Sequence, residues 1–209
     1  MRLIVLLGYC VLSFSLMGCH GVGPGTDDNP KPTGKSDFTV ILSNPQDSNA
    51  SVGTYELHIQ PSSSAYSADL DITNIWAISD CKLPTGEFRC HQVMLNLKGK
   101  PETGKLWKLV PDFSSKSSDP GTGIIYYIEG SQGRTAGWVS VSGTLRVDSV
   151  SDTDPRSVPP GYFAVKTVKF TVVDATMGPA SGDSGTDATG IFTLRGEGRA
   201  ELMTGLDGP

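Results

Sequence analysis

The chain has 209 residues, of which 25 are glycine and 14 are proline. This content of Gly and Pro disfavours long helices and argues against an all-α fold. The 17 basic and 22 acidic residues give a net charge of −5, which argues against a nucleic-acid-binding protein.

An apolar segment, residues 3–16, follows Arg2 at the start of the chain. At about fourteen residues it is too short to span a bilayer and is typical of the central part of a signal peptide. It ends in the tetrapeptide Leu16-Met17-Gly18-Cys19. The segment therefore predicts export.

The tetrapeptide resembles the lipobox of bacterial lipoproteins, in which a branched apolar residue, a variable one and a small one precede a cysteine. The resemblance implies that residues 1–18 are removed as a signal peptide and that Cys19 carries lipid. A plain secretory signal with an incidental cysteine is the alternative. By the family's sorting rule, His20 favours the outer membrane, so the expected location is the cell envelope with a lipid anchor.

Residues 19–36 are mostly Gly, Pro and polar residues. Such a composition cannot bury enough apolar surface to fold, so we expect a flexible tether behind the lipidated cysteine. Residues 37–209 are then a single folded domain.

Alternating apolar and polar residues recur from Asp37 onward, as in Tyr55, Leu57 and Ile59 near the start of the domain. Near the C-terminus the same pattern predicts an inward face, made of Phe192, Leu194, Gly196, Gly198, Ala200 and Leu202. We expect about nine strands in an antiparallel β-sandwich, with a closed β-barrel as the alternative. In the run 162–173, Val173 breaks the alternation, which indicates a bulge or burial on both faces.

A hairpin is predicted between Cys81 and Cys90, with Thr85-Gly86 as its turn. In this register the two cysteines face each other, and export makes a disulfide the expected state. Ile78 then faces Val93 and Trp76 faces Leu95, so that all four point inward.

Two side-chain arrangements follow from this register. Asp80 faces His91 as an ion pair, and the tip of the hairpin projects Leu83 and Phe88. Leu83 and Phe88 are candidates for contact with a partner, unless a neighbouring loop covers them.

Trp138 is the third candidate contact residue. Alternation places Val139, Val141, Leu145 and Val147 inward and Trp138 outward among hydroxyl side chains. An exposed indole in that setting suits stacking on a sugar. Burial beneath an adjacent loop is the alternative.

No catalytic, cofactor-binding or metal-binding residue is predicted, and no cofactor. Gly182-Asp183-Ser184-Gly185 is similar to the nucleophile motif of chymotrypsin-like proteases, but neither His58 nor His91 has the sequence setting of that family's base. Acid-bearing turns, at Asp148, Asp152 and Asp154 and again at Asp183 and Asp187, lack the order of a calcium loop.

The expected function is therefore a non-enzymatic binding or structural role in the cell envelope. The partners are the membrane, through the lipid, and an envelope glycan or protein. A secreted hydrolase whose site no motif reveals is the alternative.

Overall fold

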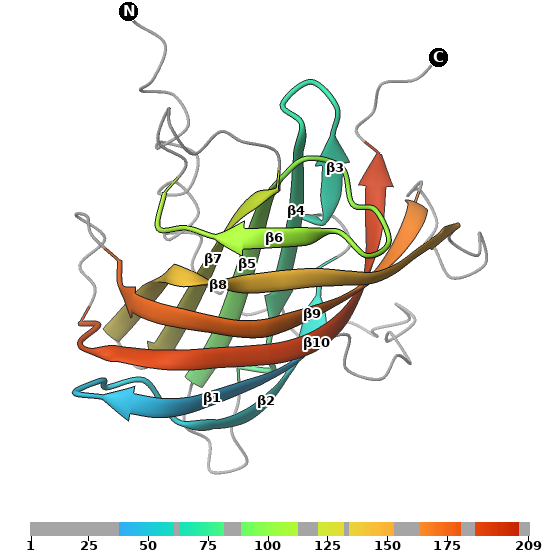
Figure 1. The fold of residues 1–209 in the computed structure, drawn as a ribbon. Helices are drawn as coiled ribbons and strands as arrows, with labels where there is room; N and C mark the ends of the chain where they lie inside the picture. The colour runs from blue at the N-terminus through green and yellow to red at the C-terminus, as the bar shows by residue number, and fades with distance from the viewer. Residues whose placement is uncertain are drawn as a thin grey trace, which may run out of the picture. The chain divides into compact units, whose positions relative to one another are not determined.

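The computed structural model describes residues 38–60, 63–81, 89–112, 121–131, 134–152, 164–180 and 187–204. Contacts divide the chain into two units, Met1–Lys35 and Ser36–Pro209, and the described residues all lie in the second. They form ten strands (Figure 1): β1 (Phe38–Gln46), β2 (Gly53–Ile59), β3 (Ala65–Ser67), β4 (Ile72–Ile78), β5 (Arg89–Lys98), β6 (Leu106–Leu109), β7 (Thr122–Ser131), β8 (Arg134–Asp152), β9 (Ala164–Pro179) and β10 (Ile191–Thr204). The predicted all-β fold is confirmed. Within those ranges no helix is long and apolar enough to cross a membrane.

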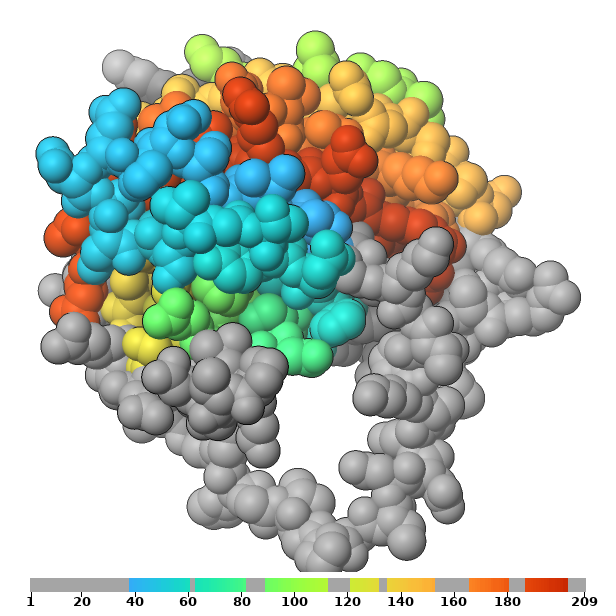
Figure 2. All heavy atoms as spheres, turned by 90° about the horizontal axis from the view of Figure 1, so that it is seen from below, coloured from blue at the N-terminus to red at the C-terminus, as the bar shows by residue number. Residues whose placement is uncertain are grey.

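The strands lie in two layers. One contains β4, β5 and β7, and the other contains β2, β1, β10, β9 and β8. In Figure 1, β8 and β9 cross in front of the first layer, and β1 and β2 lie at the bottom of the view. Antiparallel pairing joins the layers at both sides, where β2 meets β4 and β7 meets β8. In Figure 2, β1 and β2 lie between β10 on one side and β4 and β5 on the other. The parallel pairings among the described strands are short and involve β3 and β6.

Strand β8 changes the face it turns toward the core. Trp138 and Ser140 are fully buried, and so are Leu145 and Val147, although the two pairs differ in parity along the chain. The register with β9 shifts between Ser140 and Ser142 and again after Thr144. An extra residue in a strand inverts the alternation beyond it. The prediction that Trp138 points outward is therefore wrong, and Val141, predicted inward, is 48% exposed.

Gly143 makes this irregularity possible. Its φ is +132°, and a Cβ there would lie 2.0 Å from the carbonyl oxygen of Asp174 in β9. A side chain is incompatible with both the dihedral and the approach.

Strands β9 and β10 follow the sequence pattern more closely. The predicted inward face of β10 is confirmed, with Phe192, Leu194, Ala200 and Leu202 buried. In β9 the register with β10 shifts between Ala175 and Val172, so the bulge indicated by Val173 is present.

The β4–β5 pairing differs from the prediction by one residue. Ile78 lies opposite Gln92 and Trp76 opposite Met94. Ile75 and Ala77 are the inward residues of β4, beside Val93 and Leu95 of β5. Trp76 and Ile78 are therefore on the outer face, and the predicted inward placement of these two residues is wrong.

The cysteines suggested the wrong register because the disulfide joins residues that are offset by one position. Backbone hydrogen bonds continue the observed register past Ile78–Gln92: Ser79 N donates to the His91 carbonyl at 2.9 Å, and Arg89 N donates to the Cys81 carbonyl at 3.1 Å. Cys81 therefore lies opposite Arg89, and the disulfide connects it to the next residue, Cys90.

Candidate functional site

A group of polar side chains lies between the two layers, next to the disulfide. Strands β5 and β7 place His91 directly opposite Glu129 on their inward faces. Tyr127 precedes Glu129 by two residues in β7 and shares its face. We refer to the following residues as the His91 cluster: Ser51, Tyr55, Arg89, His91, Tyr127 and Glu129.

His91 is the centre of this cluster and is 4% exposed. Its Nδ1 lies 2.6 Å from the hydroxyl of Tyr127, and the ring of Tyr55 stacks on the imidazole with centroids 3.8 Å apart. Burial lowers the pKa of His91, the carboxylate of Glu129 opposes this effect, and the charge of Arg89 adds to it. The imidazole is therefore neutral at pH 7.

Glu129 connects the cluster to the segment that precedes β2. Its Oε2 accepts a hydrogen bond from the backbone N–H of Ser51 at 3.0 Å, and its Oε1 accepts one from the hydroxyl of Ser51. Arg89 donates to Ser51 Oγ at 3.2 Å, with its Nε 3.9 Å from Glu129 Oε1. Tyr55 donates to the Ser51 carbonyl at 3.0 Å. One carboxylate thus holds the end of the β1–β2 connection against β7.

Tyr127 bridges the imidazole and the carboxylate. Its hydroxyl can donate to Glu129 Oε2 at 3.4 Å, and it shares a shorter hydrogen bond with His91. Burial raises the pKa of Tyr127, and the nearby Glu129 raises it further. The phenol therefore stays protonated, and a chain of hydrogen bonds runs from His91 to Ser51.

The order of these bonds differs from that of a Ser-His-Asp catalytic triad. A catalytic serine bonds to a base that a third group orients. Here the Ser51 hydroxyl is bound to Glu129 and Arg89, while the His91 imidazole is bound to Tyr127. This arrangement holds the β1–β2 connection in place, and among the described residues the imidazole of His91 bonds to Tyr127 and not to a serine.

A second set of bonds fastens the same β1–β2 connection to the segment before β10. Asn49 Nδ2 donates to the Asp187 carbonyl at 2.6 Å, and Thr189 N donates to Asn49 Oδ1 at 2.9 Å. Gly190 has a φ of +62°, and a Cβ there would lie 2.2 Å from the carbonyl carbon of Asp47. Glycine at this position therefore permits the close approach of the two segments.

Trp138 lies in the core beneath the segment before β10, and not on the surface. It is fully buried, its Nε1 donates to the Thr189 carbonyl at 3.3 Å, and its ring packs on Tyr127 and Phe192. Its predicted role as an exposed sugar platform is wrong, and the alternative of burial beneath an adjacent loop is confirmed.

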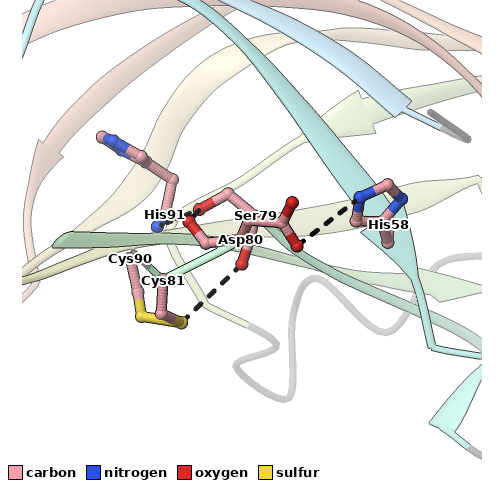
Figure 3. The surroundings of a disulfide bond; sticks show 6 residues. All are labelled: His58, Ser79, Asp80, Cys81, Cys90 and His91. Atoms are coloured by element: carbon pink, nitrogen blue, oxygen red, sulfur yellow. Dashed lines mark hydrogen bonds and ion pairs between the residues drawn. A yellow bond between two sulfur atoms is a disulfide. The ribbon is translucent and has the colours of Figure 1, made fainter. Parts of the chain in front are cut away.

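The predicted disulfide between Cys81 and Cys90 is present, with Cα atoms 4.4 Å apart. Figure 3 shows the bond and the imidazole of His91 on opposite sides of β5. Asp80 lies 3.9 Å from Nε2 of the half-exposed His58 and not against His91, so the predicted Asp80–His91 pair is wrong. The one-residue change of register is the reason, because it turns Trp76, Ile78 and, beyond them, Asp80 to the outer face. His91 keeps the inward side that it shares with Val93 and Leu95. Leu83 and Phe88 lie outside the described residues.

The predicted acid-bearing turns do not assemble a site among the residues described. Asp148 bonds to Arg146 and Thr171, and Asp152 pairs with Lys166 at 2.5 Å. No group of metal-ligating side chains occurs in the described ranges. Asp154, Asp183 and Ser184 lie outside them.

Sequence reasoning missed the His91 cluster. One signal was available in the sequence. His91 alternates in phase with Val93 and Leu95, and Glu129 alternates in phase with Ile125 and Tyr127, so both polar residues continue an inward face. The contributions of Ser51 and Tyr55 depend on how the layers meet, which no local pattern encodes.

Comparison with known proteins places the chain in no family. No family model, no curated protein and no solved structure matches it.

Proposed function

We propose that this chain is an exported bacterial lipoprotein, anchored in the cell envelope through Cys19, whose β-domain has a non-enzymatic binding or structural role. The lipobox-like residues 16–19 supply the anchor, and residues 19–36 supply the tether. Both lie outside the described residues. The observation that carries the proposal is the Cys81–Cys90 disulfide, because disulfides persist in oxidising compartments outside the cytosol.

The His91 cluster supports a structural role for this part of the domain. Its members bond to one another, and His91 is buried. A secreted hydrolase, the alternative, needs titratable groups that converge where a substrate can reach them. The membrane is the expected first partner, through lipid, and an envelope glycan or protein the second. The residue after the cysteine, His20, favours the outer membrane by the family's sorting rule.

The test is lipid attachment in bacteria that express the full chain with radiolabelled palmitate. We expect label in the membrane fraction, its loss in Cys19→Ser, and its retention in Cys10→Ser, the matched control inside the predicted signal peptide. An inhibitor of lipoprotein signal peptidase should make the uncleaved precursor accumulate. Label that persists in Cys19→Ser would contradict the proposal.

A further inference from the structure

The outer face of the β4–β5–β7 layer carries a row of large apolar side chains. Trp76 lies opposite Met94, Met94 opposite Tyr126, and Tyr126 opposite Val139 of β8. All four are partly exposed. The row therefore crosses four neighbouring strands on the side of the layer that faces away from the core.

Amide side chains flank this row. Asn74 and Asn96 lie opposite each other on one side, and Gln92 lies between Ile78 and Ile128 on the other. These side chains too are partly exposed, and none of the outward residues from 72 to 78, 92 to 96 or 124 to 128 is charged. The outer face of β10 is different, because it carries a row of alternating sign: Arg195, Glu197, Arg199 and Glu201.

Trp76 has an unsatisfied donor. Its Nε1 is buried without a hydrogen-bond partner, the sole such side-chain atom in the described part of the chain. The two core tryptophans are satisfied: Trp107 donates to the Lys98 carbonyl at 2.9 Å and Trp138 to the Thr189 carbonyl. Buried polar groups are nearly always paired, so this N–H is an exception, and the partial exposure of Trp76 lies at its other atoms.

We propose that this face, formed by Trp76, Met94 and Tyr126 with Asn74, Asn96 and Gln92, binds a neutral carbohydrate chain of the cell envelope. The aromatic rings offer flat apolar surfaces for the C–H faces of sugar rings. Each flanking amide offers donors and an acceptor for sugar hydroxyls. The inference rests on the proposed envelope location, whereas the site itself does not depend on lipidation.

The charges around the face favour a neutral glycan over an anionic surface. Lipid headgroups of bacterial membranes attract clusters of Lys and Arg. Among the described outward residues of β4, β5 and β7 the one cation is Lys98, whose Nζ donates to the Leu70 carbonyl at 2.7 Å. The phenol of Tyr126 has a raised pKa, first because it is partly buried and second because the carboxylate of Asp112 is near it. An anionic ligand would meet repulsion at this end of the row.

The test uses the full chain, purified in a mild nonionic detergent, and a panel of neutral hexasaccharides of N-acetylglucosamine, glucose and mannose. Binding is followed by tryptophan fluorescence and by calorimetry. We expect at least one member to bind and to quench the fluorescence. Trp76→Ala should weaken binding by about tenfold or more, the equivalent of one well-placed contact.

Two further variants test the aromatic and amide parts of the site separately, and a third variant serves as the control. Trp76→Phe keeps an aromatic plane of smaller area, so its affinity should fall between those of the parent and Trp76→Ala. Asn96→Ala should weaken binding without disturbing the aromatic row. Ile41→Ala, an exposed apolar residue on the opposite outer face, is the matched control and should bind as the parent does.

Three results would overturn the inference. They are no binding by any panel member, binding that persists in Trp76→Ala and Asn96→Ala, and concentration-dependent self-association or vesicle binding that Trp76→Ala abolishes. The last result would assign the face to a second copy or to a lipid surface. If no glycan binds but palmitate labelling is intact, only the glycan site is refuted. If labelling fails but a glycan binds, only the lipid anchor is refuted.

Discussion

The buried hydroxyl of Ser140 is hydrogen-bonded to the backbone of two other segments. Its Oγ accepts a hydrogen bond from the backbone N–H of Ile125 in β7 at 3.0 Å, and it donates to the carbonyl of Val110 after β6 at 3.0 Å. Ser140→Ala would leave both backbone groups without this partner, and each buried unpaired group costs about 1–3 kcal/mol. We therefore expect a loss of about 2–4 kcal/mol in the free energy of unfolding.

Ser142→Ala is the matched control, because Ser142 lies two residues further along β8 and is exposed. Its effect should stay within about 0.5 kcal/mol. Urea unfolding of both variants, followed by circular dichroism, gives the midpoints and slopes from which the difference is calculated. If the two variants unfold at the same midpoint with equal slopes, the hydroxyl does not support β7 and β6 as described.

Two more perturbations test the core. The folded-state pKa of His91 is lowered by burial, so the unfolded chain binds more protons below about pH 6.5, and stability falls as pH drops from there through the folded pKa. The measurement is the difference between the urea midpoints at about pH 7.5 and about pH 5. This difference should be smaller in His91→Gln than in the parent, and the exposed-residue control His58→Gln should behave like the parent. An equal difference in all three proteins would contradict this account. Gly198→Ala would place a Cβ 2.4 Å from Cζ of Phe170, whose ring packs edge-on against Phe38, so we expect a loss of about 1–3 kcal/mol. Gly130→Ala meets no atom within 4 Å and should unfold like the parent in thermal scans, and a Gly198→Ala that matches it would refute the close contact.

Local patterns predicted the fold wherever the alternation of a strand is uninterrupted. The face of β10 is correct because Phe192 to Leu202 keep one parity. The face of β8 is wrong near Trp138 because the register shift at Ser140 inverts the parity, and a sequence does not mark which residue is the extra one. In β9, Val173 did break the visible pattern, and there the bulge could be anticipated.

The candidate sites were harder to predict. The cysteines correctly indicated their disulfide, yet they suggested a register in which Trp76 points inward. The apolar residues Ile75 and Ala77 supply an inward face equally well in the observed register, so hydrophobicity alone did not decide between the two. The outer row through Trp76 and the separation of Asp80 from His91 both follow from this single residue of difference.

The pairing of the strands also limits how the domain can associate. Each of the ten described strands is hydrogen-bonded to a neighbour on both sides along at least part of its length. An unpaired strand edge is the usual template for intermolecular β-sheet formation, domain swapping and fibre growth. The described strands thus offer few such edges, of which residues 53–57 of β2, paired with β1 alone, are the longest in that strand. Recognition by this domain must then depend on side chains presented from the faces of its layers, where the shape and chemistry of a partner can be distinguished.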